Sequence, residues 1–183
     1  MYYKNIHGYF NYEFLYDEMI KKASNGARFV EIGAFQGKST CYLAERVIES
    51  GKAIKISVID NWVGHPSDKD LVKEIEQLGD VFSTFKTNME RAGVIKNLDI
   101  IRGDSSKSAS GFEDRSLDFV YIDAAHDYTS VVKDIKAWLP KVKVGGTIAG
   151  HDYGSPNSGV KDAVNSVLGG NVKIKLDTWM YEV

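Results

Sequence analysis

Apolar and polar positions along the chain follow two periods, one typical of amphipathic helices and one typical of buried strands. Helical spacing of apolar residues predicts helices over residues 14–23, 39–50, 131–139 and about 159–168, with two more inside 61–94. Short apolar runs bounded by turn residues predict strands over residues 28–32, 54–60, 98–102, 117–123 and 147–150. The last thirteen residues, 171–183, are typical of a terminal pair of short strands.

The alternation of strands and helices predicts an α/β fold with a mostly parallel sheet. Five such units followed by a strand pair indicate a doubly wound, seven-stranded sheet with a C-terminal antiparallel strand pair. We expect a single domain over residues 1–183, with residues 1–27 as an N-terminal helical cap and 61–94 as a helical insertion over the strand ends.

Composition narrows the function classes. The net charge is −2 and no run of Lys and Arg is long enough to follow a phosphate backbone, so we expect no nucleic-acid partner. No apolar run reaches the length of a membrane span, and residues 1–10 lack the apolar core of a signal peptide. With one cysteine, Cys41, no internal disulfide can form. We expect a cytoplasmic protein without a membrane partner.

A glycine-rich turn follows the first predicted strand. Gly33 and Gly37 precede a helix whose free N–H groups attract an anion. A dinucleotide fingerprint needs a glycine where Phe35 stands, and a phosphate-binding NTPase loop needs four residues between its glycines rather than three. An acidic residue, Glu31, followed by this turn fits the adenosylmethionine-binding pattern. The alternative is a tight turn that binds no ligand.

Polar residues also follow the second and third strands. Asp60 ends the second strand, where a carboxylate can accept both hydroxyls of a ribose. Asp104 and Ser105 follow the third strand and are candidates for contact with an adenine edge. Taken alone, each position equally fits a solvated strand end or a simple turn.

A candidate metal site lies at the ends of the fourth and fifth strands. Asp123 ends one, and His151 with Asp152 ends the other. Neighbouring parallel strands lie roughly 5 Å apart, so these side chains can converge. Two carboxylates suit Mg²⁺, whereas a histidine ligand favours Mn²⁺, Fe²⁺ or Zn²⁺. The alternative is that Asp152 caps a turn and Asp123 is a buried, paired acid.

His126 lies three residues after Asp123 and is a candidate general base, because imidazole titrates near neutral pH. The alternative is an ordinary surface histidine. His7 and His65 show no convergent partners in the sequence, and we expect both to be ordinary.

With these motifs in place, the chain resembles a class I S-adenosylmethionine-dependent methyltransferase with a Rossmann-like sheet over nearly its whole length. Its turn, from Glu31 to Ser39, resembles that of catechol O-methyltransferase-like enzymes. The segment from Gly145 to Tyr153 resembles a subfamily of short bacterial and phage methyltransferases related to that group and to macrocin O-methyltransferase.

The resemblance implies a role for each motif. Ser39 would hold the methionine carboxylate and Asp60 the ribose. Asp123, His151 and Asp152 fall where the metal-dependent groups place a magnesium triad, although those groups carry an acid at the position of His151. His126 falls at the position of the catalytic base. The implied activity is metal-assisted O-methylation of a hydroxyl on a small molecule or sugar, with S-adenosyl-L-methionine and Mg²⁺ or Mn²⁺ as cofactors.

Three other functions are alternatives to O-methyl transfer. A nucleic-acid base methyltransferase would carry Asp/Asn-Pro-Pro-aromatic after the fourth strand, and Ala124-Ala125-His126 follows Asp123 instead. A P-loop NTPase is disfavoured by the short turn. A non-catalytic or repurposed relative, either cofactor-binding or a hydroxylase-like metal protein, is harder to exclude. A homodimer is expected only from the frequency of such assemblies.

Overall fold

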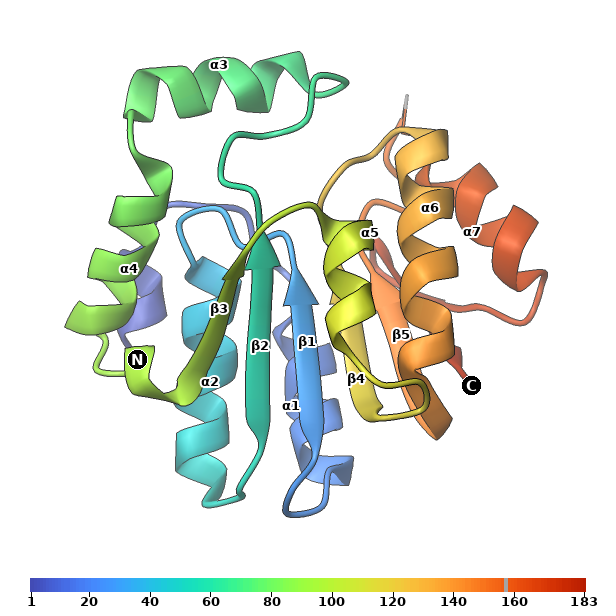
Figure 1. The fold of residues 1–183 in the computed structure, drawn as a ribbon, viewed down its shortest axis with the longest axis horizontal. Helices are drawn as coiled ribbons and strands as arrows, with labels where there is room; N and C mark the ends of the chain where they lie inside the picture. The colour runs from blue at the N-terminus through green and yellow to red at the C-terminus, as the bar shows by residue number, and fades with distance from the viewer. Residues whose placement is uncertain (157) are drawn as a thin grey trace.

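The computed structural model describes residues 1–156 and 158–183. Seven strands form one sheet in the order β3-β2-β1-β4-β5-β7-β6, which is the predicted doubly wound α/β arrangement (Figure 1). Strands β1 to β5 are parallel, and β7 and β6 complete the sheet in antiparallel pairs. The strands are β1 (Arg28–Ile32), β2 (Lys55–Asp60), β3 (Leu98–Arg102), β4 (Leu117–Ile122), β5 (Val142–Gly150), β6 (Lys173–Lys175) and β7 (Thr178–Glu182).

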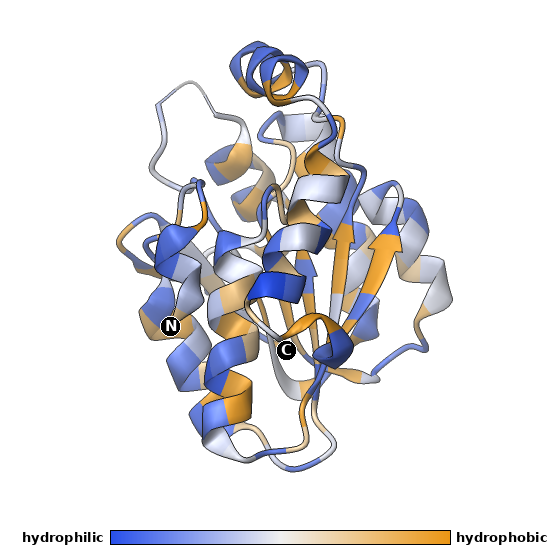
Figure 2. Ribbon diagram, turned by 90° about the vertical axis from the view of Figure 1, so that its left-hand side faces the viewer, coloured by the Kyte–Doolittle hydropathy of each residue, from blue (hydrophilic) through white to orange (hydrophobic). Residues whose placement is uncertain are grey.

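Helices cover both faces of this sheet because the central strands are apolar on both sides. The α-helices are α1 (Glu13–Lys22), α2 (Lys38–Ser50), α3 (Lys69–Leu78), α4 (Val81–Arg91), α5 (Ser105–Ser108), α6 (Tyr128–Trp138) and α7 (Val160–Leu168). One core cluster joins the sheet to α1, α2 and α4, and a second joins it to α6 and α7. Figure 2 shows the resulting apolar strands enclosed by helices with polar outer faces.

The fifth strand is longer than the sequence pattern predicts. It begins at Val142 rather than at residue 147, because Val142 pairs with Leu117 on β4. Gly145 donates a backbone hydrogen bond to Val183 O, and Val183 N returns one to Gly146 O. Partners that are distant in sequence therefore extend a segment whose own residues interrupt the apolar pattern.

Two segments stand over the carboxyl ends of the strands. The insertion after β2 forms α3 and α4, and α3 lies above the upper edge of the sheet in Figure 1. In the N-terminal segment, residues 6–12 run between a short 3-10 helix, Tyr2–Asn5, and α1, which packs on a face of the sheet rather than over the strand ends (Figure 1). His7 on this segment contacts Glu74 on α3 at 2.7 Å, which links the two segments. In the described part of the chain, no helix has the length and apolar character needed to cross a membrane.

Candidate active site

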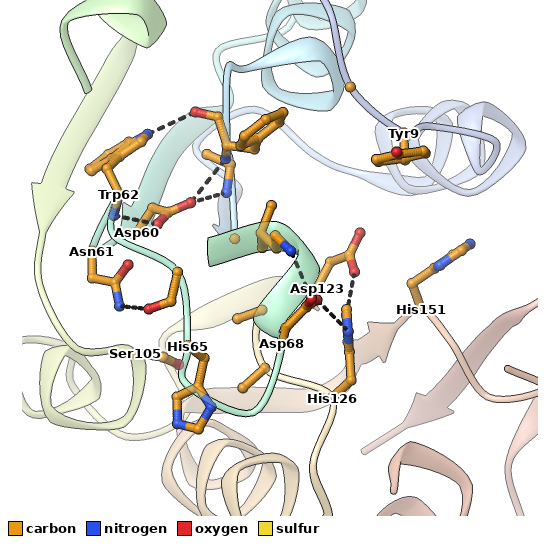
Figure 3. Close-up of a pocket in the computed structure, with 18 of the residues that line it drawn as sticks. Tyr9, Asp60, Asn61, Trp62, His65, Asp68, Ser105, Asp123, His126 and His151 are labelled. Atoms are coloured by element: carbon orange, nitrogen blue, oxygen red, sulfur yellow. Dashed lines mark hydrogen bonds and ion pairs between the residues drawn. The ribbon is translucent and has the colours of Figure 1, made fainter. Parts of the chain in front are cut away.

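A cavity of about 620 Å³ lies at the carboxyl ends of the strands, beneath the N-terminal segment and α3 (Figure 3). Its volume is within the range of roughly 300–1,000 Å³ that small-molecule and cofactor sites occupy. Most of the sequence-predicted site residues line it: Gly33, Ser39, Asp60, Asp104, Ser105, Asp123, His126, His151 and Asp152.

The glycine turn brings the end of β1 against the end of β4. Gly33 has a φ of +88°, and a Cβ atom there would lie 1.8 Å from the carbonyl oxygen of Asp123. Only glycine permits this backbone approach. Gly37 also has a positive φ, and its missing Cβ leaves room for Phe85 and Met89 of α4. The two glycines thus set the turn by backbone packing, and Gly37 itself does not line the cavity.

Glu31 lies behind the turn rather than in the cavity wall. Glu31 is fully buried, and its carboxylate accepts hydrogen bonds from Tyr16 and Thr40. Burial raises the pKa of Glu31 to about 7. Glu31 does not line the cavity, so we expect it to affect a bound cofactor only indirectly, through the conformation of the glycine turn.

Asp60 also holds the turn. Its Oδ2 accepts from the backbone N–H groups of Ala34 and Phe35 at 2.7 and 2.9 Å, and its Oδ1 accepts from Trp62 N at 2.7 Å. Trp62 in turn donates from its indole nitrogen to Phe35 O at 2.8 Å. These contacts, drawn in Figure 3, join the end of β2 to the glycine turn. The sequence gives no sign of them, and the predicted contact between Asp60 and a ribose stays a prediction.

The N-terminus of α2 is open toward the cavity. Gly37 stands at its N-cap in a left-handed conformation, and among the described residues no side chain caps it. By contrast, aspartates cap α3, α4, α5 and α6. Lys38 and Ser39 of its first turn line the cavity. Free N–H groups at a helix N-terminus bind anions, so this end is suited to a carboxylate.

Asp104 and Ser105 begin the short helix α5 after β3. Asp104 Oδ1 caps that helix by accepting from Lys107 N at 3.0 Å, and it also accepts from Ser106 Oγ at 2.8 Å. Ser105 Oγ accepts a hydrogen bond from the indole of Trp138 at 3.3 Å. Both residues line the cavity at the end of β3.

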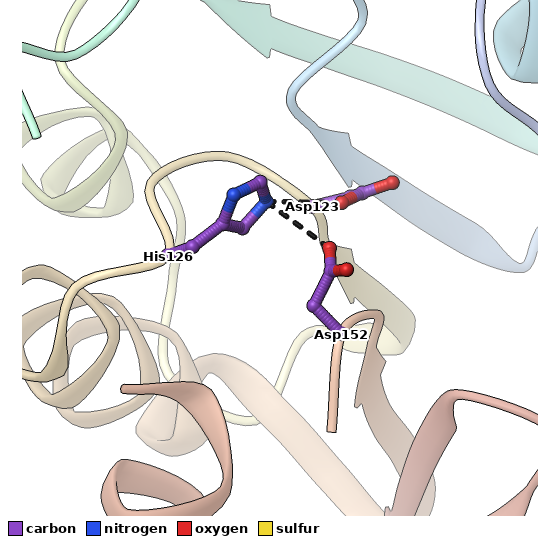
Figure 4. A group of neighbouring side chains, drawn as sticks. All are labelled: Asp123, His126 and Asp152. Atoms are coloured by element: carbon purple, nitrogen blue, oxygen red, sulfur yellow. Dashed lines mark ion pairs between the residues drawn. The ribbon is translucent and has the colours of Figure 1, made fainter. Parts of the chain in front are cut away.

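Three titratable side chains converge at the ends of β4 and β5. Asp123, His126 and Asp152 each offer one ligand atom, and these atoms lie within 4.8 Å of one another (Figure 4). His126 Nε2 lies 3.2 Å from Asp152 Oδ2 and 3.8 Å from Asp123 Oδ1. The carboxylates, Asp123 first, raise the pKa of His126 to about 9. Positive charge placed between the carboxylates would lower that pKa again.

His151 is oriented differently from the sequence-based expectation of a triad with Asp123 and Asp152. Its Nδ1 lies 3.3 Å from Asp152 Oδ2, and its Nε2 contacts Asn11 Oδ1 at 2.9 Å. It forms a separate group of potential ligands with Asp152 and Asp177. The structure therefore brings His126, rather than His151, together with both aspartates, and the ligand role of His151 stays a prediction.

Several cavity residues have no sequence signal of the kind used above. The buried Tyr12 donates to Asp123 Oδ2 at 3.3 Å and lies beside the ring of Tyr121. Asp68 Oδ2, from the start of α3, lies 3.7 Å from His126 Nδ1. His65 lines the cavity close to Ser130 and is not the isolated residue that its sequence context indicates. All of these contacts join segments that are far apart in the chain.

The sheet order, the glycine turn at the end of β1 and the cavity over the strand ends together define a class I S-adenosylmethionine-dependent methyltransferase. Comparison with protein families agrees: a family model described as a methyltransferase domain matches residues 30–153. The chain belongs to this methyltransferase-domain family.

Solved structures share the fold at low sequence identity. The O-methyltransferase NovP has a TM-score of 0.71 and 16% identity, over 93% of this chain and 78% of that one. A putative rRNA methylase from Clostridium thermocellum has a TM-score of 0.65 and 12% identity, over 95% of this chain and 96% of that one. An S-adenosylmethionine-dependent O-methyltransferase from Thermotoga maritima has a TM-score of 0.61 and 16% identity, over 91% of this chain and 52% of that one.

Proposed function

We propose that this methyltransferase transfers the methyl group of S-adenosylmethionine to a hydroxyl of a small acceptor, with Asp123 and Asp152 as holders of a divalent cation and His126 as the general base. The observation that carries the proposal is the convergence of these three side chains at one end of the cofactor-sized cavity. The similarity of the fold to the O-methyltransferases NovP and the Thermotoga maritima enzyme supports the choice of oxygen as the acceptor atom.

The residues present fit a hard cation. Two carboxylates, Asp123 and Asp152, offer the oxygen ligands for it. Among the described side chains, His126 Nε2 is a buried nitrogen without a hydrogen-bond partner that faces both carboxylates, and in this proposal it stays off the cation and accepts the proton. When bound, Mg²⁺ or Mn²⁺ would orient the acceptor hydroxyl and lower its pKa. With both ring nitrogens of His151 in contact with Asp152 and Asn11, we assign His151 the role of orienting Asp152.

The chain's own residues supply the remaining steps. His126 Nε2 accepts the proton of the hydroxyl, and the oxygen attacks the methyl carbon of the sulfonium. The carbon–oxygen bond forms as the carbon–sulfur bond breaks, which leaves S-adenosylhomocysteine and a methyl ether. Positioning of the two reactants in line contributes much of the rate of such a transfer.

The wall opposite the sheet indicates the charge of the acceptor. Asp68, Asp70 and Glu74 of the insertion line the cavity, and His7 pairs with Glu74. An acceptor with a phosphate or carboxylate group would meet like charge there. A neutral polyol, such as a sugar, or an amine-bearing one fits better. A cytoplasmic location and a homodimer stay predictions.

The test measures release of S-adenosylhomocysteine from a panel of neutral hydroxylated acceptors, with Mg²⁺, with Mn²⁺ and with a chelator. We expect turnover that requires the cation and that Asp123→Asn or Asp152→Asn abolishes, while S-adenosylhomocysteine still binds in calorimetry. Asp162→Asn is the matched control, because it makes the same change at an exposed position of α7 away from the cavity lining. Unchanged turnover in both site variants would contradict the cation's role.

A further inference from the structure

A buried carboxylate on α6 has no part in the chemistry described above. Asp134 is only 5% exposed, yet it is one of the residues that line the cavity. No cation forms an ion pair with it among residues 1–156 and 158–183. The adjacent Lys133 is largely exposed and lies 4.0 Å from Asp104 instead. The Ser105 hydroxyl favours the ionised form of Asp134 through a hydrogen bond, yet burial still raises the pKa of this carboxyl. One neutral donor therefore offsets the burial of the charge only in part, and the carboxylate keeps acceptor capacity for a ligand.

The cavity geometry indicates which part of the cofactor Asp134 faces. This inference rests on the proposed function, in which methyl transfer takes place beside the convergent group formed by Asp123, His126 and Asp152, so the sulfonium is assigned to that end. The open N-terminus of α2 suits the methionine carboxylate. The remaining end of the cavity, after β3, is lined by Asp104, Ser105 and Asp134. The adenine ring is therefore expected at that end.

At this end Asp134 is better placed than Asp104 to discriminate between ligands. Asp104 Oδ1 already accepts two hydrogen bonds within α5, and its side chain is 48% exposed. Water can replace a ligand contact at such an exposed group with little loss. Water cannot replace a ligand contact at the buried Asp134 in this way. A polar ligand group that did not match the carboxylate would therefore stay without a hydrogen-bond partner.

We propose that Asp134 accepts a hydrogen bond from the exocyclic amine of the cofactor's adenine and thereby selects adenosyl over 6-oxopurine ligands. The adenine amine is a donor and suits a carboxylate. The 6-oxo group of hypoxanthine is an acceptor, and it would face the carboxylate oxygens without a proton between them. Burial raises the pKa of Asp134 to about 6, so the carboxylate is still mainly ionised at pH 7.5.

The experiment titrates the full chain calorimetrically at pH 7.5 with S-adenosylhomocysteine and with S-inosylhomocysteine, its 6-oxo analogue. We expect the wild-type protein to bind the adenosyl ligand about 10- to 100-fold more tightly, as one hydrogen bond to a charged group contributes. Asp134→Asn should weaken the adenosyl ligand about tenfold and strengthen the inosyl ligand, because an amide can turn its N–H₂ toward the 6-oxo group.

The control variant is Asp162→Asn, which makes the same charge change at an exposed position of α7 and should leave both affinities unchanged. Thermal unfolding without ligand is the second measurement. Asp134→Asn should be as stable as the wild type or more so, since it removes a buried charge, whereas loss of a structural contact would destabilise it. Equal wild-type affinity for the two ligands, or unchanged selectivity in Asp134→Asn, would overturn the proposal. Binding of neither ligand by the wild type would overturn it together with the cofactor assignment.

Discussion

Replacement of Gly33 by alanine tests whether the approach of β1 to β4 organises the site. A Cβ at Gly33 would lie 1.8 Å from Asp123 O and 2.5 Å from Asp123 C. Contacts of a Cβ atom shorter than 3.0 Å are essentially never seen, so the end of β1 and the end of β4 must move apart. Both atoms in question belong to the backbone, so no side-chain rotation can relieve the overlap.

The cost follows from the contacts at this point. A positive φ of +88° in alanine costs about 1–2 kcal/mol. Two backbone hydrogen bonds hold the end of β1 that must move: Gly33 N donates to Ile59 O on β2 at 2.9 Å, and Ile32 O accepts from Asp123 N after β4 at 2.8 Å. Straining both costs about 1 kcal/mol each. We therefore expect Gly33→Ala to lower the free energy of unfolding by about 3–4 kcal/mol, a large part of the roughly 5–15 kcal/mol of a typical domain.

Equilibrium unfolding in urea measures this loss. Gly51→Ala is the matched control, because Gly51 has a φ of +67° and nothing lies within 4 Å of its Cβ position. That variant carries the φ cost without the overlap and should lose only about 1–2 kcal/mol. Gly33→Ala should also weaken S-adenosylhomocysteine binding, since it displaces the turn and Asp123. Equal destabilisation by the two substitutions would refute the reasoning.

Two further predictions concern side chains near the site. Asp68→Asn preserves the cap of α3 but removes the negative charge that faces His126. We expect kcat to fall about tenfold, which is part of the roughly 10²–10⁴ that general acid–base catalysis contributes. Asp80→Asn, at the cap of α4, is the control and should leave kcat unchanged in the same assay. Burial raises the pKa of Glu31 in the folded state to about 7 from 4.5, so its ionisation destabilises the fold above pH 7, and the penalty disappears as pH falls toward 4.5. Glu31→Gln should thus gain about 2 kcal/mol relative to the wild type between pH 5 and 8.5 in unfolding titrations, and a pH-independent difference would contradict this.

The sheet could be predicted from the sequence because its central strands are buried on both faces. The run from Leu117 to Ile122 needs no partner to be recognised as a strand. The first half of β5 could not, since Lys143 and Gly145 break the apolar pattern. Its strand conformation depends on pairing with β4 and on hydrogen bonds to Val183, and neither is visible in the local sequence.

Among the site residues, those at the ends of strands could be predicted from the order of the strands in the sheet. Asp123 and Asp152 follow the adjacent strands β4 and β5, and that alone predicts their convergence. Which histidine joins them depends on the loop after β4, and the structure brings His126 closer than His151. The contacts of Asp60 with the glycine turn depend on the local backbone conformation. Phe35 and Trp62 both adopt positive φ values, which cannot be predicted from the residue type because bulky side chains rarely adopt them.

Asp134 differs from these cases because the sequence does contain a signal for it. On α6, Val131, Ile135 and Trp138 recur at helical spacing and form the buried face. Position 134 lies three residues after Val131 and four before Trp138, so a periodic pattern places a charge on the inward stripe. Such a residue contradicts the pattern of its helix, and the hydrogen bond with Ser105 offsets the cost of its burial only in part, since its pKa remains raised. An acidic side chain on the apolar stripe of a helix that follows a cofactor-binding strand is thus a feature to search for in sequences of this fold.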